Sequence, residues 1–294
     1  MKLSITSGAV CGVRENGQVR FLPHLGIEQC ARAGFDRMEY NLLAGPTADR
    51  LMARGNWREE LFRLRQTLDE NAMIVPYTHD AWFMMAQTVD ASDVAFKEEM
   101  VRRSVEATCI LGGKRMVVHA QSIYDSEGYN ESKTWEYNRA FLSEIGELAA
   151  RDGIGLDVEN LFPVAGMIEF SSRAEDLMNL MQTINDPTMG ICWDLGHANM
   201  AKVDHMQALE TVAPWLRLIH AADNKATVDE HNIPGYGTVP WDAVMSKLKS
   251  IGYAGDLNLS VRTFAYPSIP QQRVRALEML FGIGNDLIDM FDKA

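Results

Sequence analysis

Residues that can bind a metal ion follow five consecutive apolar runs of this 294-residue chain. The ends of these runs read Thr78-His79-Asp80, Val118-His119-Ala120, Asp157-Val158-Glu159-Asn160, Trp193-Asp194-Leu195-Gly196-His197 and Ile219-His220-Ala221-Ala222-Asp223. Five of the seven histidines lie at or just after such an end, namely His79, His119, His197, His220 and His231. One histidine after an apolar run is more often a hydrogen-bonded core or surface residue than a metal ligand. Five such ends in succession predict one shared site.

Glu159, Asp194 and His220 form the candidate ligand set. Carboxylate oxygens with an imidazole nitrogen suit Mn²⁺ first, with Mg²⁺, Co²⁺ or Zn²⁺ as alternatives, and they offer no thiolate. Taken singly, Asp194 could cap a helix and Glu159 could pair with a Lys or Arg side chain. Burying both carboxylates at one place is costly without a cation, so the sequence predicts a divalent metal as cofactor.

The elements that must position these residues alternate between strand and helix. Apolar runs that predict strands cover residues 3–6, 35–40, 73–78, 115–119, 154–158, 190–193, 216–220 and 256–261. Between the runs, apolar residues recur at the spacing of one helix face, which predicts helices. They are Leu61, Leu64 and Leu68; Val94, Val101 and Val105; Phe141, Ile145 and Leu148; and Leu277, Leu280 and Leu287. Parallel strands joined by helices build either a doubly wound open sheet or a closed barrel.

Eight such units favour closure, and no GxGxxG follows the first strand to support a nucleotide-binding open sheet. We therefore predict the α/β class and a single (β/α)8 TIM barrel domain over residues 1–294. In such a barrel the C-terminal ends of the strands meet at the catalytic mouth, which is where the polar run ends would lie.

Composition restricts the class of partner. Lys and Arg number 28 against 40 Asp and Glu, and a net charge of −12 argues against a general nucleic-acid binder. No apolar run approaches the roughly 20 residues that span a bilayer, and the first residues contain no signal-peptide core. The cysteines are far apart with no CxxC pair, which favours a reducing cytoplasm. They are Cys11, Cys30, Cys109 and Cys192.

Four stretches, LDVEN, ICWDLGH, LIHAAD and DEHNIPGYGTVPW, resemble the xylose-isomerase-like TIM-barrel superfamily. That superfamily holds sugar isomerases and epimerases, inosose dehydratases and the endonuclease IV group. The resemblance covers nearly the whole chain in strand order and is sharpest from residue 155 to 241. It implies an enzyme with a small carbohydrate substrate, and either a homo-oligomer or a partner subunit. The charge and the short apolar runs argue against a nucleic-acid or membrane partner.

In the ketose epimerase branch, the resemblance implies four metal ligands at the ends of the fifth to eighth strands. The first three match Glu159, Asp194 and His220, whereas the eighth-strand glutamate falls on Ser260. A hydroxyl is a poor substitute for a carboxylate and cannot accept a carbon-bound proton at neutral pH. Glu159 is then the one inherited base, which disfavours a two-base epimerase. Three alternatives stay open: the last strand has another register, Asp256 or another group supplies the carboxylate, or the chemistry uses one base.

The resemblance also implies substrate contacts at the mouth. His197 would contact substrate oxygens and act with Glu159 in catalysis, although a hydrogen bond to neighbouring backbone is an equal alternative. In the endonuclease IV group, a D-x-H pair like Asp229 and His231 binds a further metal, and histidines occur on the third and fourth strands. We expect substrate contacts from His79, His119, His197, Asp229, His231, Ser260 and Arg262.

The leading hypothesis is a divalent-metal-dependent isomerase or epimerase that abstracts a proton beside the carbonyl of a keto sugar or keto polyol. One alternative is a lyase of the same family, either a keto-inositol dehydratase or a C-glycoside deglycosidase subunit. Others are an endonuclease IV-like nuclease and, because of Ser260, a degenerate barrel without activity. The apolar run Trp82-Phe83-Met84-Met85 either covers a substrate face or packs on the scaffold or at a subunit interface.

Overall fold

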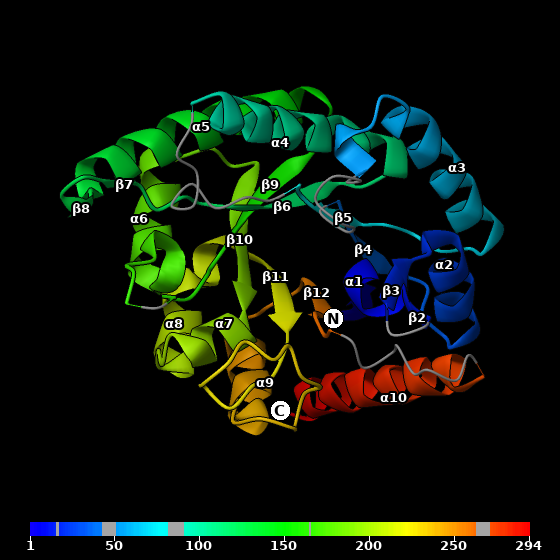
Figure 1. Cartoon of the computed structure of the whole chain (residues 1–294). Helices are drawn as coiled ribbons and strands as arrows, with labels where there is room; N and C mark the ends of the chain where they lie inside the picture. The colour runs from blue at the N-terminus through cyan, green and yellow to red at the C-terminus, as the bar shows by residue number, and fades with distance from the viewer. Residues whose placement is uncertain (16–17, 43–50, 82–90, 165, 263–270) are drawn as a thin grey trace.

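Eight parallel strands close into a barrel at the centre of the computed structural model (Figure 1). The structure describes residues 1–15, 18–42, 51–81, 91–164, 166–262 and 271–294. In chain order the barrel strands are β1 (Lys2–Thr6), β4 (Met38–Asn41), β5 (Tyr77–His79), β6 (Arg115–His119), β9 (Gly155–Glu159), β10 (Met189–Asp194), β11 (Leu216–Ala221) and β12 (Asp256–Leu259). Pairing of β1 with both β4 and β12 closes the ring, which confirms the predicted (β/α)8 barrel.

Helices surround the barrel and bury the apolar faces that the spacing predicted (Figure 1). The longer ones are α2 (Pro23–Arg32), α3 (Trp57–Glu70), α4 (Ala91–Leu111), α5 (Glu131–Arg151), α6 (Ala174–Ile184), α8 (His205–Val212), α9 (Trp241–Ser250) and α10 (Gln272–Lys293). Leu61, Leu64 and Leu68 show the pattern, because all three are buried along one face of α3.

Short elements fill the loops between these units. In the part of the chain that the structure describes, antiparallel hairpins form from β2 (Gly12–Glu15) with β3 (Gln18–Phe21) and from β7 (Tyr124–Asp125) with β8 (Gly128–Tyr129). The short helices are α1 (Ser7–Val10), α7 (Leu195–Met200), η2 (Leu51–Ala53), η4 (Phe170–Ser172) and η5 (Ala213–Trp215). Among the described residues, no helix is both long and apolar enough to cross a bilayer.

The two-residue period of the strands sets which side chains reach the mouth. Tyr77, Val117, Cys192 and Leu218 form a small buried cluster of their own. The residues two positions later on the same strands are His79, His119, Asp194 and His220. Since positions i and i+2 point to the same face of a strand, these polar side chains lie above an apolar layer, at the carboxyl ends of the strands.

Asp256 lies at the opposite end of the barrel. It begins β12, and its Oδ2 is 2.9 Å from Arg37 Nη2 and 3.0 Å from Arg37 Nε. The alternative that Asp256 supplies the missing carboxylate at the mouth is therefore wrong, because three residues of extended strand lie between it and Ser260.

His205 provides a pH-dependent contribution to stability. This first residue of α8 is 8% exposed, neither ring nitrogen has a hydrogen-bond partner among the described residues, and burial lowers its pKa below the usual value. Below pH 6.5 the unfolded chain takes up this proton more readily than the folded chain. As the pH is lowered below 6.5, the free energy of unfolding should therefore decrease, by at most about 1.4 kcal/mol per pH unit.

We expect the His205→Leu variant to gain stability relative to the wild type as the pH is lowered from 7 to 5, measured by urea denaturation. His24→Leu is the matched control, because His24 is exposed. A stability difference between His205→Leu and wild type that stays constant from pH 7 to pH 5 would contradict this account.

Candidate active site

A cavity of about 320 Å³ opens at the carboxyl end of the barrel strands. Its size is that of a site for a small molecule. Its lining includes His79, His119, Glu159, His197, His220, Asp229, His231, Ser260 and Arg262. Asp194 lies behind this wall and is fully buried. The structure thus brings together all the side chains that the sequence placed at the mouth.

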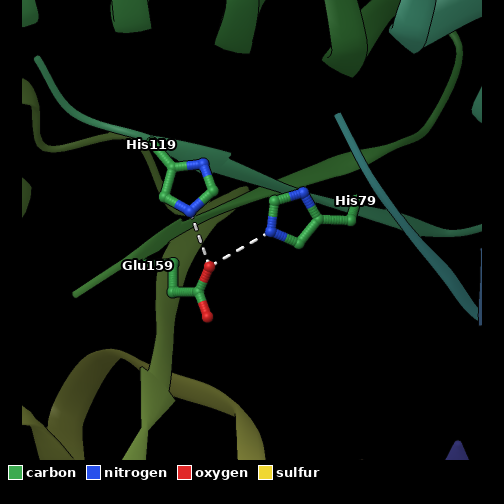
Figure 2. Close-up of side chains that lie close together, drawn as sticks. All are labelled: His79, His119 and Glu159. Carbon is green, nitrogen blue, oxygen red and sulfur yellow. Dashed lines mark hydrogen bonds and ion pairs between the residues drawn. The ribbon is translucent and has the colours of Figure 1, made fainter. Parts of the chain in front are cut away.

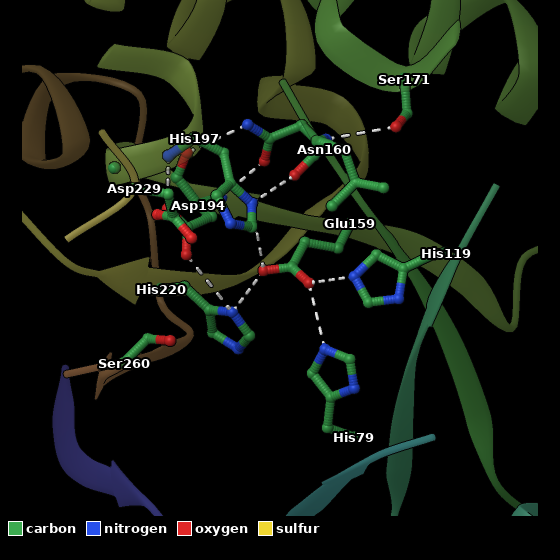
Figure 3. A network of polar contacts seen from close by, with 12 residues as sticks. His79, His119, Glu159, Asn160, Ser171, Asp194, His197, His220, Asp229 and Ser260 are labelled. Atoms are coloured by element: carbon green, nitrogen blue, oxygen red, sulfur yellow. Dashed lines mark hydrogen bonds and ion pairs between the residues drawn. The ribbon is translucent and has the colours of Figure 1, made fainter. Parts of the chain in front are cut away.

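Glu159 occupies the centre of the cluster and contacts three histidines. Its Oε2 accepts hydrogen bonds from His119 Nε2 at 2.7 Å and His79 Nε2 at 3.1 Å (Figure 2). Its Oε1 lies 2.6 Å from His220 Nδ1 (Figure 3). The strand register explains one of these contacts, because His119 of β6 pairs directly with Glu159 of β9. The partners of this carboxylate are imidazoles rather than a Lys or Arg.

Charge complementarity holds this arrangement together. Burial opposes a positive charge on His79, but the adjacent carboxylates of Asp80 and Glu159 outweigh it and raise the pKa of His79 to about 10. Burial would likewise raise the pKa of Glu159, yet the neighbouring histidines, His220 foremost, hold it well below the usual range. Asp80 supports both rings, with Oδ1 at 3.5 Å from His79 Nδ1 and 3.8 Å from His119 Nδ1.

Asp194 has two separate roles for its two oxygens. Oδ1 accepts the backbone N–H of His197 at 2.7 Å and caps the N-terminus of α7. Oδ2 is buried, accepts no hydrogen bond from the described residues, and lies 3.9 Å from His220 Nδ1. The cap therefore leaves one oxygen for a metal ion, so capping and metal binding do not compete for this side chain.

His197 joins the cluster while bonded to the backbone. Its Nδ1 donates to the carbonyl of Asn160 at 2.8 Å and lies 3.9 Å from Glu159 Oε1 (Figure 3). The ring also packs against Phe162, with centroids 5.2 Å apart. Since the backbone bond uses Nδ1, Nε2 remains for a ligand in the cavity that His197 lines.

The donor atoms gather in overlapping groups. Within each group, one ligand atom per residue lies within 4.8 Å of the others. The groups are His79, His119 and Glu159; Glu159, Cys192 and His220; Glu159, Asp194 and His197; and His197, Asp229 and His231. Glu159 belongs to three of these four groups, so a cation bound in any of the three would interact strongly with its carboxylate.

Asp229 and His231 are placed by the loop after β11. His231 Nδ1 donates to the Ser260 carbonyl at 2.6 Å, and its Nε2 lies 3.1 Å from Asp229 Oδ2. Arg262 Nη1 reaches the same Asp229 oxygen at 3.2 Å, while most of the Arg262 side chain, 59%, stays exposed. Arg262 thus stands at the rim of the cavity and lends one positive charge to it.

Asp223 organises that loop from inside. Its carboxylate accepts N–H groups from Asn224, Gly235, Val239 and the Trp241 indole at 2.8–3.1 Å. A side chain on Gly237 would collide with the same carboxylate and with the carbonyl of Asn224. The motif PGYG therefore serves a loop that must wrap closely around Asp223 to bring Asp229 and His231 over the barrel.

Ser260 stands at the position where the resemblance led us to expect a carboxylate. Its backbone N–H continues the pairing with β11 by donating to the Ala221 carbonyl at 3.2 Å. Its hydroxyl lines the cavity and lies 3.5 Å from His231 Nδ1. The register of this strand is therefore as expected, and the eighth strand contributes a neutral group to the mouth.

Sequence reasoning missed Glu39 and gave no role to Asp80. Glu39, on β4, is 1% exposed, and its Oε2 lies 2.6 Å from His220 Nε2. The strand-end rule, applied to the second strand as it was to the later ones, would have found this carboxylate in the run FDRMEYN. The predicted apolar cover from Trp82, Phe83, Met84 and Met85 lies outside the described residues.

Comparison with known proteins assigns the architecture. The profile of the family described as xylose isomerase-like TIM barrel matches residues 27–281. An uncharacterised protein of Methanocaldococcus jannaschii is 31% identical over 163 residues, which is 55% of each chain. The fructoselysine 3-epimerase of Escherichia coli O157:H7 is 27% identical over 138 residues, 47% of this chain and 49% of that one. The chain spans about half the length of these two relatives.

A solved structure shows the same fold over the full length. The crystal structure of a D-tagatose 3-epimerase-like protein aligns with a TM-score of 0.73 and 22% identity, covering 100% of this chain and 99% of that chain. At this identity the likeness concerns the fold.

Proposed function

The chain belongs to the xylose isomerase-like TIM barrel family, and we propose that it is a divalent-metal-dependent sugar isomerase or epimerase. Its substrate would be a keto sugar or keto polyol, from which it abstracts a proton beside the carbonyl. The observation that carries this proposal is the position of Glu159, whose two oxygens contact His79, His119 and His220 at the wall of the cavity. The similarity to a fructoselysine 3-epimerase supports the same class of reaction.

Glu159, Asp194 and His220 would hold the ion, Mn²⁺ in our proposal. Their donors fit one, because Asp194 Oδ2 is buried without a hydrogen bond from the described residues and lies 3.9 Å from His220 Nδ1. The same nitrogen is 2.6 Å from Glu159 Oε1, and oxygen with imidazole nitrogen is a donor set suited to Mn²⁺. When bound, the ion would polarise the substrate carbonyl and stabilise the developing negative charge.

The side chains of the site divide the remaining work. Glu159 takes the proton from the carbon beside the carbonyl and returns it after the double bond has moved. His197 and His231, which line the cavity, hold the substrate hydroxyls. Leu161 and Phe162 give the wall an apolar portion that excludes water from the reacting carbon. Because Ser260 cannot act as a second base, Glu159 returns the proton to the face that it left. Delivery to the former carbonyl carbon gives the isomer, whereas an epimer requires a second proton donor on the opposite face.

Proton exchange tests this function. The Mn²⁺-loaded protein would be incubated in deuterated water with a panel of ketopentoses, ketohexoses and keto-inositols, and deuterium beside the carbonyl followed by NMR. We expect exchange with at least one ketose, together with its isomer or epimer. Release of water or of an aglycone without an isomer would assign the lyase alternative. No exchange with any substrate of the panel would overturn the proposal.

A metal-dependent nuclease is the second candidate. The groups His79–His119–Glu159 and His197–Asp229–His231 favour it, because several ions bound side by side suit phosphodiester hydrolysis. The net charge of −12 disfavours it, since duplex binding depends on neutralising phosphates. Incubation with an abasic DNA duplex decides between the two, and cleavage that is lost in Asp229→Ala would establish the nuclease.

A further inference from the structure

Glu39 contacts the back of the proposed metal ligand His220. Its Oε2 lies 2.6 Å from His220 Nε2, whereas the other ring nitrogen, Nδ1, lies 2.6 Å from Glu159 Oε1. Figure 3 shows Nδ1 directed toward Glu159 and Asp194, with Nε2 on the far side of the ring. The imidazole therefore lies between two carboxylates, with Glu159 at Nδ1 and Glu39, which also lines the cavity, at Nε2.

A buried network fixes the carboxylate of Glu39 itself. Asn258 Nδ2 donates to the same Oε2 at 3.2 Å, and Asn258 Oδ1 accepts from the Ser4 hydroxyl at 3.2 Å. The Ser4 hydroxyl in turn contacts the Tyr77 hydroxyl. The register supports this network, because Asn258 pairs with Ser4 on one side and with His220 on the other. Strands β1, β4, β5, β11 and β12 thus jointly hold this carboxylate in place.

Glu39 does not take over the ligand position that Ser260 leaves. An imidazole ring separates its carboxylate from Glu159, and none of the donor groups found among the described residues includes Glu39. Its role must therefore act through His220. An ionised carboxylate only accepts hydrogen bonds, so in this arrangement both ring nitrogens of His220 donate, Nε2 to Glu39 and Nδ1 to Glu159. A metal ion at Nδ1 would take the place of the proton there, while Glu39 keeps the proton on Nε2. That tautomer leaves the Nδ1 lone pair directed at Glu159 and Asp194.

We propose that Glu39 is a positioning residue that accepts the Nε2–H of His220 and so holds Nδ1 toward a metal ion. The inference rests on the metal site of the proposed function. Outer carboxylates of this kind orient a ligand histidine, and their removal typically lowers metal affinity about 10- to 100-fold.

Co²⁺ titration of purified metal-free protein tests the proposal, followed by calorimetry and by the visible absorption of bound Co²⁺. We expect Glu39→Ala to weaken Co²⁺ binding by about 100-fold and to change the absorption spectrum at saturation. Glu39→Gln keeps an acceptor for Nε2–H but loses the charge, so it should weaken binding by about 10-fold. It also keeps the side-chain volume, which provides a folded variant if Glu39→Ala does not fold.

Glu169→Ala is the matched control. Glu169 is also a buried carboxylate, but its Oε1 accepts from the Ser122 hydroxyl at 3.1 Å and it does not line the cavity. We expect its Co²⁺ affinity and spectrum to match the wild type. Wild-type affinity and spectrum in both Glu39 variants would overturn the inference, as would an equal loss in Glu169→Ala.

The Co²⁺ titration and the proton-exchange experiment together distinguish failure of this inference from failure of the proposed function. If the wild type binds Co²⁺ and the Glu39 variants bind it more weakly, but no ketose exchanges its proton, the inference stands and the reaction is wrong. If the wild type binds no Co²⁺, the metal site is wrong, and the role of Glu39 falls with it.

Discussion

Glu159→Gln is expected to lower proton exchange with the preferred ketose by at least about a thousand-fold. The amide cannot take a proton from carbon, and general-base catalysis alone accounts for factors of about 10² to 10⁴. The substitution also removes the charge that His79, His119 and His220 surround. Exchange would be measured by NMR at saturating Mn²⁺, so that a lower metal affinity does not by itself account for the loss.

Glu169→Gln serves as the control for this variant, because it neutralises another buried carboxylate outside the cavity lining. Its exchange rate should stay within about threefold of the wild-type rate, because the substitution changes no side chain that lines the cavity. Retention of more than a tenth of the wild-type exchange rate by Glu159→Gln would show that another group is the base.

Removal of divalent metal is expected to abolish exchange and to lower thermal stability together. Without a cation, Glu159 and Asp194 remain buried beside the cavity. At an Mn²⁺ concentration of 100 times the dissociation constant, binding to the folded state adds about 2.7 kcal/mol. For a chain of this length that corresponds to a rise in melting temperature of roughly 5 °C.

The experiment compares chelated protein, protein reloaded with Mn²⁺ and Asp194→Asn under the same two treatments. The wild type should regain exchange and the higher melting temperature on reloading. Asp194→Asn should show little response, because its amide is a weaker ligand than the carboxylate oxygen left over by the α7 cap. Full activity in chelated protein shown by elemental analysis to contain no divalent metal would contradict the account.

The barrel could be predicted from the sequence because two periodicities determine it. Alternating apolar runs mark strands, helical spacing marks the layer around them, and eight repeats leave few ways to cover both faces of the strands. The predicted strand at residues 115–119 matches β6 exactly in its bounds, and the other strands differ by a few residues at their ends. The hairpins β2–β3 and β7–β8 lack such a repeated signal.

The strand pattern also predicted which side chains lie at the mouth of the barrel. It did not predict which of their atoms are in contact. Strand ends placed His79, His119 and Glu159 at one rim, but which nitrogen meets which oxygen depends on side-chain rotamers across strands. Glu39 shows the limit most clearly. The strand-end rule could have placed this glutamate at the mouth, but its contact with His220 joins side chains 181 positions apart, which no local pattern predicts.

The central claim is that Glu159, Asp194 and His220 hold a divalent ion at the wall of a sugar-sized cavity. Anomalous diffraction from crystals grown with Mn²⁺ tests it most directly, because the signal identifies the ion and locates it. The account predicts an Mn²⁺ peak bonded to an oxygen of Glu159, to Asp194 Oδ2 and to His220 Nδ1. Absence of a peak there, with Mn²⁺ bound only at His197, Asp229 and His231 or nowhere in the barrel, would contradict it.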